Sequence, residues 1–234
     1  MTKIGVLLSG CGFKDGSEIH EATLALYFLD RAGAQVVCMA PDAAQHDVVD
    51  HATGRATRES RNMLVEAARI ARGKIVDLAS VSTAELDGLV MPGGFGAAKN
   101  LCDFALQGGR AQAHPQVQRM LREMHAARKP IGAICIAPAV VAASFRGTAT
   151  HAKLTIGEHA GTADALRALG AEHANCGVRE FVVDEANRIV STPAYMYDAR
   201  ISEVAAGIER LVAEVMRLSS LGSSAHPSPS RATS

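Results

Sequence analysis

Residues 131–143 read IGAICIAPAVVAA, and this stretch decides the fold. Residues 131–134 form an apolar run of strand length, and residues 136–143 form a second apolar run of helix length. A helix without a polar stripe must be buried on all sides. A short, uniformly apolar strand is typical of a parallel sheet that is covered on both faces. The stretch therefore predicts a central strand that leads into a central helix, with Cys135 at the junction.

Strand and helix patterns alternate on both sides of this stretch. Short apolar runs bounded by turn residues predict strands, and apolar residues at helical spacing predict helices. The predicted strands are residues 4–8, 35–39, 75–78, 89–91, 131–134 and 153–156. We also predict a hairpin at residues 181–190 and an irregular excursion or hairpin at residues 48–57. The predicted helices are residues 18–31, 61–72, 116–128, 136–143, 162–169 and 199–218. Several βα units without a repeat period predict an α/β fold, a doubly wound and mostly parallel sheet with helices on both faces.

Length and composition predict one globular domain. The chain has 234 residues, 48% of them hydrophobic, and its 24 Lys and Arg residues balance its 24 Asp and Glu residues. This length suits one large α/β domain, which we assign to residues 1–218. Residues 219–234 are rich in Ser, Pro and Ala, which predicts a disordered tail. The balanced charge, without a basic cluster, argues against nucleic acid or an anionic membrane surface as a partner.

Targeting, metal and cofactor signals are weak. The sequence shows neither a secretory signal nor an apolar stretch of transmembrane length, so we expect a cytoplasmic protein. Its five cysteines are scattered, and its nine histidines include no pair at metal-ligand spacing. This predicts neither a disulfide framework nor a metal site. Residues 10–16 read GCGFKDG, in which the glycine spacing departs from the dinucleotide-binding fingerprint. We therefore expect no cofactor.

Cys135 is the first candidate catalytic residue, because ligands of such sheets bind beyond the carboxyl ends of the strands. Residues 133–137 read AICIA, a variant of the Gly-x-Ser-x-Gly elbow in which small residues flank a nucleophile at a sharp turn. The N-terminus of the following helix favours the thiolate and predicts a lowered thiol pKa. The alternative is a small, unreactive cysteine packed in an apolar helix.

A glycine-rich loop follows the preceding strand. Residues 92–96 read PGGFG, and glycines allow backbone N–H groups to approach an oxyanion closely. If the two strands are neighbours, the N–H groups of Gly94 and Ile136 lie beside Cys135. The alternative is an ordinary turn.

Two carboxylates begin the helix predicted at residues 18–31. We interpret Glu18 as the N3 residue of a capping box that starts at Asp15. Glu21 has no capping role, and a carboxylate near a thiolate in a dry cleft would have a raised pKa and could move a proton. A solvated surface glutamate is the alternative for Glu21.

Two motifs resemble a known family. Residues 89–101, LVMPGGFGAAKNL, and 133–138, AICIAP, resemble the PfpI-like branch of the class I glutamine-amidotransferase-like superfamily. Residues 4–21 and 191–196 extend the resemblance to nearly the whole chain. It implies a flavodoxin-like fold, a homodimer, and a cofactor-independent glyoxalase that converts glyoxal, a small reactive dicarbonyl, to glycolate. Another interpretation of the same activity is deglycation of early glycated adducts.

The resemblance also implies roles for individual residues. Cys135 matches the nucleophile of the family, and Glu21 matches the carboxylate that faces it. Gly94 and Ile136 match the oxyanion donors, and Glu18 matches a less central neighbour.

One departure from the family limits the chemistry. Many relatives carry a histidine after the strand that follows the nucleophile helix, where this chain reads LTIGE at residues 154–158 and has His159 just beyond. A Cys–His dyad is therefore unsupported, and glutaminase or protease activity, which needs an imidazole beside the thiol, is disfavoured. Residues 191–195 replace the segment that carries the histidine of true glutamine amidotransferases.

Two other functions stay open at this point. One is a non-enzymatic protein linked to isoprenoid metabolism, which senses oxidation through the same thiol or binds a partner. The other is a hydrolase of unidentified specificity, which requires His159, Glu158 or His20 within hydrogen-bonding distance of Cys135.

Overall fold

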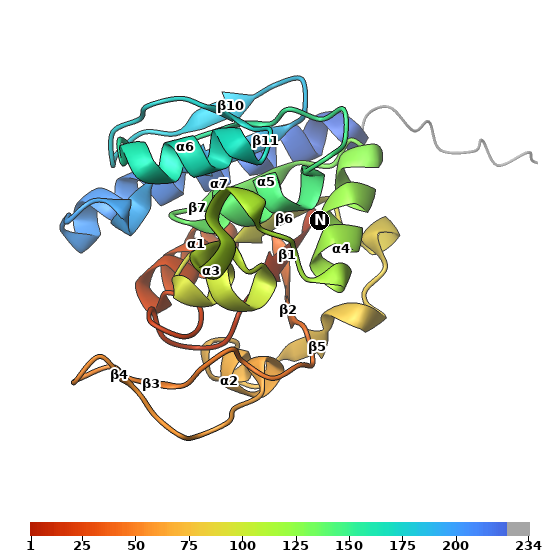
Figure 1. Cartoon of the computed structure of the whole chain (residues 1–234). Helices are drawn as coiled ribbons and strands as arrows, with labels where there is room; N and C mark the ends of the chain where they lie inside the picture. The colour runs from red at the N-terminus through yellow and green to blue at the C-terminus, as the bar shows by residue number, and fades with distance from the viewer. Residues whose placement is uncertain (224–234) are drawn as a thin grey trace, which may run out of the picture.

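The computed structural model describes residues 1–223, and one seven-stranded sheet forms its centre (Figure 1). Its strands are β1 (Lys3–Leu7), β2 (Gln35–Ala40), β5 (Ile75–Asp77), β6 (Gly88–Met91), β7 (Ile131–Ile134), β10 (Val182–Asp184) and β11 (Ile189–Thr192). They lie in the order β10-β11-β7-β6-β1-β2-β5. All neighbours are parallel except β10 and β11, which form an antiparallel hairpin. The predicted mostly parallel sheet and this hairpin are confirmed.

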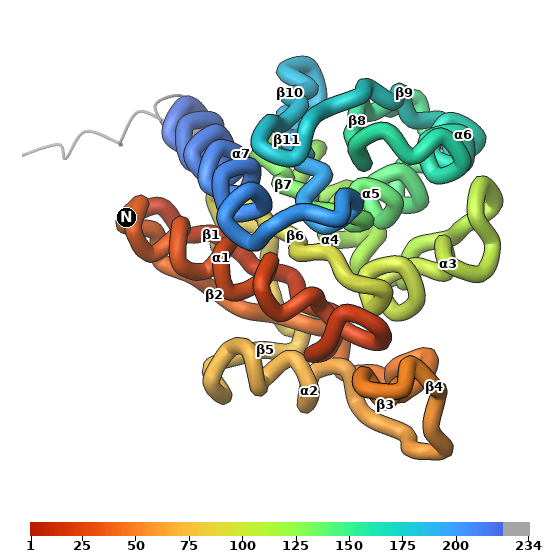
Figure 2. The backbone as a smooth tube through the Cα atoms, turned by 90° about the vertical axis from the view of Figure 1, so that its left-hand side faces the viewer, coloured from red at the N-terminus to blue at the C-terminus, as the bar shows by residue number. Residues whose placement is uncertain are grey.

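Helices cover both faces of the sheet, as predicted. They are α1 (Ile19–Arg31), α2 (Met63–Ile70), α3 (Phe104–Gln107), α4 (Pro115–Ala126), α5 (Ala137–Phe145), α6 (Ala160–Ala168) and α7 (Ile201–Ser223). The buried residues form two clusters, one with α1 and α7 and the other with α4 and α5. Figure 2 shows these two helix pairs on opposite sides of the sheet. Every residue of α5 is buried, in agreement with its uniformly apolar sequence.

Helix α7 lies close to β7 because Gly132 has no side chain. A Cβ at Gly132 would lie 3.0 Å from both the Leu211 and the Val215 side chains. The helix continues to Ser223, so the prediction of disorder from residue 219 is wrong for residues 219–223. The physical reason is burial: Ser219 is enclosed by the fold, and its hydroxyl donates to the Val215 carbonyl. The rest of the predicted tail, residues 224–234, lies outside the described residues.

Three short segments complete the fold. The excursion predicted at residues 48–57 is a hairpin of β3 (Val49–Asp50) and β4 (Arg55–Ala56). The strand predicted at residues 153–156 is β8 (Lys153–Leu154), which pairs with β9 (Glu172–His173) in a separate two-stranded sheet. Between β6 and α3, the π-helical turn η3 (Ala97–Leu101) follows the glycine loop. Within residues 1–223, no helix combines the length and apolar character that a membrane span requires.

Candidate active site

Cys135 occupies a sharp turn between β7 and α5. Its backbone has φ 61°, the left-handed region that residues other than glycine rarely adopt. The turn is held by the Cys135 N–H, which donates to the Thr192 carbonyl at the end of β11 over 2.9 Å. The side chain is 7% exposed and borders a pocket. The structure therefore has the backbone geometry of a nucleophile elbow at the predicted junction.

The glycine loop after β6 lies against this turn, because β6 and β7 are adjacent strands. A Cβ at Gly93 would lie 2.6 Å from the Cβ of Cys135 and 2.9 Å from the Ile134 carbonyl, so only glycine fits. The backbone N–H groups of Gly94 and Ile136 donate toward the Cys135 sulfur. The structure thus brings both predicted donors to the thiol, as the pairing of the two loops requires.

The loop after β1 fixes the position of the glycine loop. Three backbone hydrogen bonds join the two loops. The Phe95 N–H donates to the Phe13 carbonyl at 2.7 Å, and the Gly96 N–H donates to the Gly16 carbonyl at 2.9 Å. In the opposite direction, the Glu18 N–H donates to the Gly93 carbonyl at 3.0 Å. The contact is so close that a Cβ at position 94, where φ is +90°, would lie 2.4 Å from the Gly16 oxygen. The donor loop is therefore held rigidly before any ligand binds.

Glu21, on the first turn of α1, is fully buried and faces Cys135. Its carboxyl group hydrogen-bonds the Cys135 side chain. One carboxyl oxygen accepts the Gly93 N–H at 2.9 Å, and the other accepts the Tyr195 N–H at 3.3 Å. Backbone groups from two separate loops thus orient the carboxyl group toward the sulfur. The solvated-surface alternative for Glu21 is wrong.

Burial dominates the protonation of this pair. Desolvation and the neighbouring charge of Glu18 raise the pKa of Glu21 from 4.5 to about 8, against the hydrogen bonds from Gly93 and Cys135. Burial first, and then the charge of Glu21, raises the pKa of the Cys135 thiol, while the N–H groups at positions 94 and 136 lower it. The expected lowered thiol pKa is therefore wrong, because two N–H donors do not offset the burial of the thiol.

The charge of Glu21 opposes the thiolate only while Glu21 is ionised. When the carboxyl group is protonated, that repulsion disappears and its O–H can donate to the sulfur. The two groups therefore titrate as a coupled pair, and the pKa of the first deprotonation is a property of the pair rather than of either residue.

Glu18 is the N-cap of α1 and not the N3 residue that the sequence predicted. Its carboxylate accepts the Glu21 N–H at 2.7 Å, and the helix begins at Ile19. The predicted capping box fails because the Asp15 carboxylate is used elsewhere: it accepts the Val49 N–H at 2.7 Å. Glu18 also lines the pocket beside Cys135, so it combines a structural role with a place at the site.

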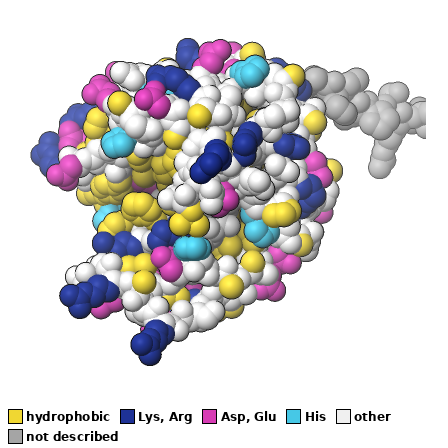
Figure 3. All heavy atoms as spheres, viewed as in Figure 1, with side chains coloured by type: hydrophobic (Ala, Val, Ile, Leu, Met, Phe, Trp, Pro, Cys, Tyr) yellow, Lys and Arg dark blue, Asp and Glu magenta, His cyan; other side chains and the backbone are white. Residues whose placement is uncertain are grey.

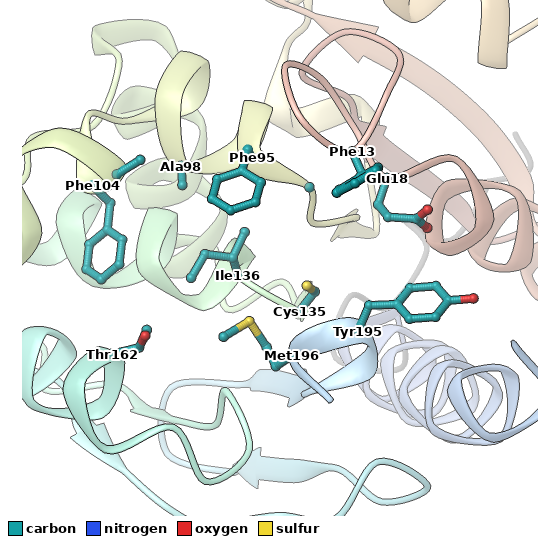
Figure 4. Close-up of a pocket in the computed structure, with 12 residues that line it drawn as sticks. Phe13, Glu18, Phe95, Ala98, Phe104, Cys135, Ile136, Thr162, Tyr195 and Met196 are labelled. Carbon is teal, nitrogen blue, oxygen red and sulfur yellow. The ribbon is translucent and has the colours of Figure 1, made fainter. Parts of the chain in front are cut away.

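The pocket that contains Cys135 has a volume of about 400 Å³. Figure 4 shows the thiol in the middle, with Glu18 and Tyr195 on one side and apolar side chains on the other. In Figure 3, hydrophobic side chains gather in a hollow between α6 and the segments around α1 and α3. The apolar lining comes from Phe13, Phe95, Ala98, Phe104, Ala105, Ile136 and Met196.

Sequence comparison identifies the family. The model of the DJ-1/PfpI family matches residues 11–196, which contain the glycine loop, Cys135 and Glu21. The chain belongs to the DJ-1/PfpI family. The resemblance noted from the two motifs is thereby confirmed at the level of the family, together with the flavodoxin-like, class I glutamine-amidotransferase-like α/β fold.

Several relatives match over nearly the full length of this DJ-1/PfpI chain. The rat "ES1 protein homolog, mitochondrial" is 46% identical over 92% of this chain and 84% of its own. The human "Glutamine amidotransferase-like class 1 domain-containing protein 3, mitochondrial" is 47% identical over 92% and 83%. The crystal structure of an isoprenoid biosynthesis protein with amidotransferase-like domain from Ehrlichia chaffeensis has 38% identity and a TM-score of 0.88, over 93% of this chain and 99% of that one.

The comparison overturns the expected cytoplasmic localisation. The rat, human and zebrafish relatives are all mitochondrial by name, the zebrafish protein at 33% identity. The expectation rested on the lack of an apolar secretory signal or membrane span. Mitochondrial targeting segments are amphipathic and Arg-rich instead, so that criterion does not detect them.

The candidate bases other than Glu21 lie away from the thiol of this DJ-1/PfpI protein. His159 caps α6, where its Nδ1 accepts the Thr162 N–H at 3.2 Å, and it does not line the pocket. His20 hydrogen-bonds the Tyr195 hydroxyl at 3.0 Å. Glu158 is exposed and also outside the pocket lining. Among residues 1–223, no histidine forms a dyad with Cys135, and no group of three His, Cys, Asp or Glu residues is placed to hold a metal ion.

The sequence reasoning missed the part of the site that follows β11. Tyr195 supplies the second backbone donor to Glu21, and Met196 lines the pocket; both belong to the short turn η5 (Ala194–Met196). A signal was present, because this segment follows a strand that neighbours β7 and therefore ends at the same edge of the sheet. Phe104 had no such signal, since α3 was not predicted.

Proposed function

We propose that this protein is a cofactor-independent glyoxalase of the ElbB type, which converts glyoxal and water to glycolate. The observation that carries the proposal is the fully buried Glu21 carboxyl group hydrogen-bonded to Cys135, with the N–H groups of Gly94 and Ile136 beside the sulfur. This arrangement supplies a nucleophile, a proton carrier and oxyanion donors within one site.

In the first step, the Cys135 sulfur adds to one aldehyde carbon of glyoxal. A C–S bond forms, and the carbonyl electron pair moves to oxygen, which the N–H groups of Gly94 and Ile136 stabilise. The proton of the thiol passes through Glu21 to that oxygen and gives a neutral hemithioacetal. The buried carboxyl group, already hydrogen-bonded to the sulfur, is positioned for this transfer.

In the second step, Glu21 in its carboxylate form removes the hydrogen of the thiol-bearing carbon, and an enediol forms. The same carboxyl group returns a proton to the neighbouring carbon, which leaves a thioester of glycolate. Water then attacks the thioester, the C–S bond breaks and the thiol is regenerated. One carbon is oxidised and the other reduced within the substrate, so the net reaction consumes only water.

The pKa of Glu21 supports its role as a proton carrier. A carboxyl group with a pKa of about 8 exchanges its proton near neutral pH, whereas an ordinary glutamate is fully ionised there. Neither His20 nor His159 takes this role, since each has another hydrogen-bond partner, and the carboxylate of Glu18 caps α1.

The test is glycolate formation from glyoxal by metal-free protein, with Cys135→Ser, Glu21→Gln and Cys176→Ser in parallel. We expect many turnovers by the wild type and loss of at least about 1,000-fold in kcat/KM for the first two variants. Cys176→Ser is the matched control, because this buried thiol lies outside the pocket and its bond to the Gly177 carbonyl suits a hydroxyl equally well. Retained turnover in Cys135→Ser contradicts the proposal.

The same experiment tests the non-enzymatic alternative. A protein that forms no glycolate while hydrogen peroxide oxidises Cys135 selectively would be a redox sensor. The burial and raised pKa of the Cys135 thiol disfavour this reaction, because peroxide attacks the thiolate.

The homodimer implied by the family resemblance remains a prediction, which light scattering of the purified protein tests.

A further inference from the structure

Two polar side chains of the motif at residues 89–101 take no part in the chemistry described so far. Lys99 and Asn100 lie on the π-helical turn η3, directly after the glycine loop. Turns of this kind are rare and frequently occur at functional sites. The Lys99 side chain is 17% exposed and Asn100 is 8% exposed. An ammonium group in such a place requires partners, and these partners identify what Lys99 holds.

The Asn100 amide joins η3 to two other segments by neutral hydrogen bonds. Its oxygen accepts the His46 N–H at 2.8 Å, and its nitrogen donates to the Ser9 and Asp15 carbonyls, both at 2.9 Å. These bonds connect η3 to the segment before β3 and to the loop after β1, which lie side by side in Figure 2. They determine where η3 lies, but they involve no charge.

The Lys99 ammonium group makes a second set of contacts with the same segments. It donates to the Asp47 carboxylate at 2.7 Å and to the Lys14 carbonyl at 3.2 Å. It also lies 5.8 Å from the centre of the Phe95 ring, a cation–π contact with the glycine loop itself. One charged group therefore connects the glycine loop, the loop after β1 and the segment before β3.

Asp47 depends on Lys99 for compensation of its charge. The Asp47 side chain is 24% exposed, and its Oδ1 atom is buried without a hydrogen-bond partner. Within residues 1–223, Lys99 is the only cation that pairs with Asp47. A partly buried pair is screened less than a surface pair. Loss of the Lys99 charge leaves the carboxylate poorly solvated, which favours movement of its segment toward water.

The contacts of Lys99 lie on both sides of a hydrogen bond that fixes the glycine loop. The Phe95 N–H donates to the carbonyl of Phe13, the residue directly before Lys14. Lys99 contacts the Phe95 ring on one side of this bond and the Lys14 carbonyl on the other. Gly94, the oxyanion donor, directly precedes Phe95. A shift between the two loops therefore moves this donor.

We propose that the Lys99–Asp47 ion pair is a positioning element for the reaction at Cys135, which holds the Gly94 N–H where the oxyanion forms. This inference rests on the proposed function. Lys99 lies outside the pocket lining, so it acts through the glycine loop and not on the substrate. Oxyanion donors act mainly in the transition state, and a small displacement lowers kcat more than it raises KM.

The experiment measures kcat and KM for glyoxal with Lys99→Met, Lys99→Arg and Lys14→Met. We expect Lys99→Met to lower kcat at least about tenfold, with KM within about threefold of the wild type. Lys99→Arg keeps the charge and should retain most of the activity. Lys14→Met is the matched control, because the Lys14 ammonium lies over the Phe13 ring but forms no ion pair within the described residues. Unchanged kcat in Lys99→Met, or an equal loss in Lys14→Met, overturns the proposal.

A double-mutant cycle tests whether the ion pair acts as a unit. Asp47→Asn breaks the pair from the other side and leaves a neutral side chain of the same shape. The double variant of Lys99→Met with Asp47→Asn holds no uncompensated charge, so it keeps the proposal testable where Lys99→Met alone unfolds. Because both changes remove one interaction, its loss of kcat should stay within about threefold of the larger single loss. Losses that multiply contradict a shared ion pair.

A measurement on the thiol distinguishes failure of this inference from failure of the proposed function. The Gly94 N–H lowers the pKa of the Cys135 thiol, so its displacement should raise the pH midpoint of Cys135 alkylation by iodoacetamide. In Lys99→Met we expect a rise of at least about 0.5 pH unit, a threefold loss of rate at fixed pH. Lys14→Met should follow the wild type, which separates position from loss of charge.

The two failures then have different signatures. If the wild type forms no glycolate but Lys99→Met shows this shift, the proposed function fails and the ion pair retains its positioning role. An unchanged alkylation midpoint in Lys99→Met overturns the inference about the ion pair, whatever the wild-type turnover of glyoxal.

Discussion

The two ends of the central sheet use glycine for different reasons. At the amino end, Gly33 and Gly73 follow helices with φ of +72° and +78°, and a Cβ on either would meet nothing within 4 Å. At the carboxyl end, a Cβ on Gly93 or Gly94 would lie 2.4 to 2.9 Å from atoms of the neighbouring loops. The turns at the amino end need only the backbone conformation. The loops at the carboxyl end need the missing side chain, because they pack directly against the reactive pair.

Gly93→Ala should have the largest effect and provides the most direct test of this comparison. The new methyl group would meet the Cys135 Cβ and a Glu21 carboxyl oxygen, and it would displace the nucleophile, the proton carrier and the adjoining donor at once. We expect kcat/KM for dicarbonyls to fall on the order of 1,000-fold, measured as glycolate formation. The Gly93 backbone is not in the left-handed region, so the loss reports contact rather than strain. Activity close to wild type would show that the carboxyl-end loops tolerate side chains.

The pH dependence of stability is a second test of how closely the loops at the carboxyl end of the sheet enclose the reactive pair. The folded protein holds a proton on Glu21 up to about pH 8, whereas the unfolded chain releases it near 4.5. Stability from this group is therefore fully present below pH 4.5 and is lost as pH rises through about 8. The free energy of unfolding should fall by roughly 3 kcal/mol between pH 5 and pH 8.

Denaturant unfolding at several pH values measures this slope, with Glu21→Gln as the reference. Because the amide does not titrate, subtracting the two curves removes the contribution of all other groups. Parallel curves for variant and wild type would mean that Glu21 titrates like an ordinary surface carboxylate.

The pH dependence of activity should reflect the same pair. Since loss of one proton from the Cys135–Glu21 pair creates the reactive anion, kcat/KM should rise about tenfold per pH unit and level off above about pH 8. The carboxyls of Asp50 and Glu203 cannot cause this inflection, because hydrogen bonds lower the pKa of each below its ordinary range. A plateau that begins near pH 5 would assign catalysis to a different group.

Gly33→Ala should have the smallest effect and completes the comparison from the amino end. Alanine fits the open space around position 33, so the only cost is the left-handed backbone, about 1 kcal/mol of stability. Thermal unfolding measures that cost, and kcat/KM should match the wild type. A loss of activity here would show that the amino-end turns also shape the site.

The sequence predicted the sheet and the elbow because both depend on local patterns. Residues 131–143 are apolar throughout, and every residue of β7 and α5 is indeed buried. Adjacent strands end at the same edge of the sheet, which is why the glycine loop and Cys135 could be placed side by side in advance.

The helix cap, the thiol pKa and one backbone donor could not be predicted from the sequence, because each depends on residues that are distant along the chain. The Asp15 carboxylate looks available as a helix cap until the fold places the Val49 N–H against it. The thiol pKa depends on the burial of the Cys135 side chain, which no spacing in the sequence reveals. The backbone N–H of Tyr195 carries no sequence signature as a donor to Glu21.

That last hydrogen bond has a consequence for the timing of folding. It joins positions 174 residues apart, and the Cys135 turn likewise closes on the Thr192 carbonyl. Strand β11 is the last strand of the sheet in chain order, so the ribosome must release nearly the whole polypeptide before Cys135 and Glu21 can be locked together. Contacts of such long sequence separation form late in folding. A nascent or truncated chain therefore carries both residues as an ordinary thiol and an ordinary carboxylate, and the reactive pair arises only in the finished protein.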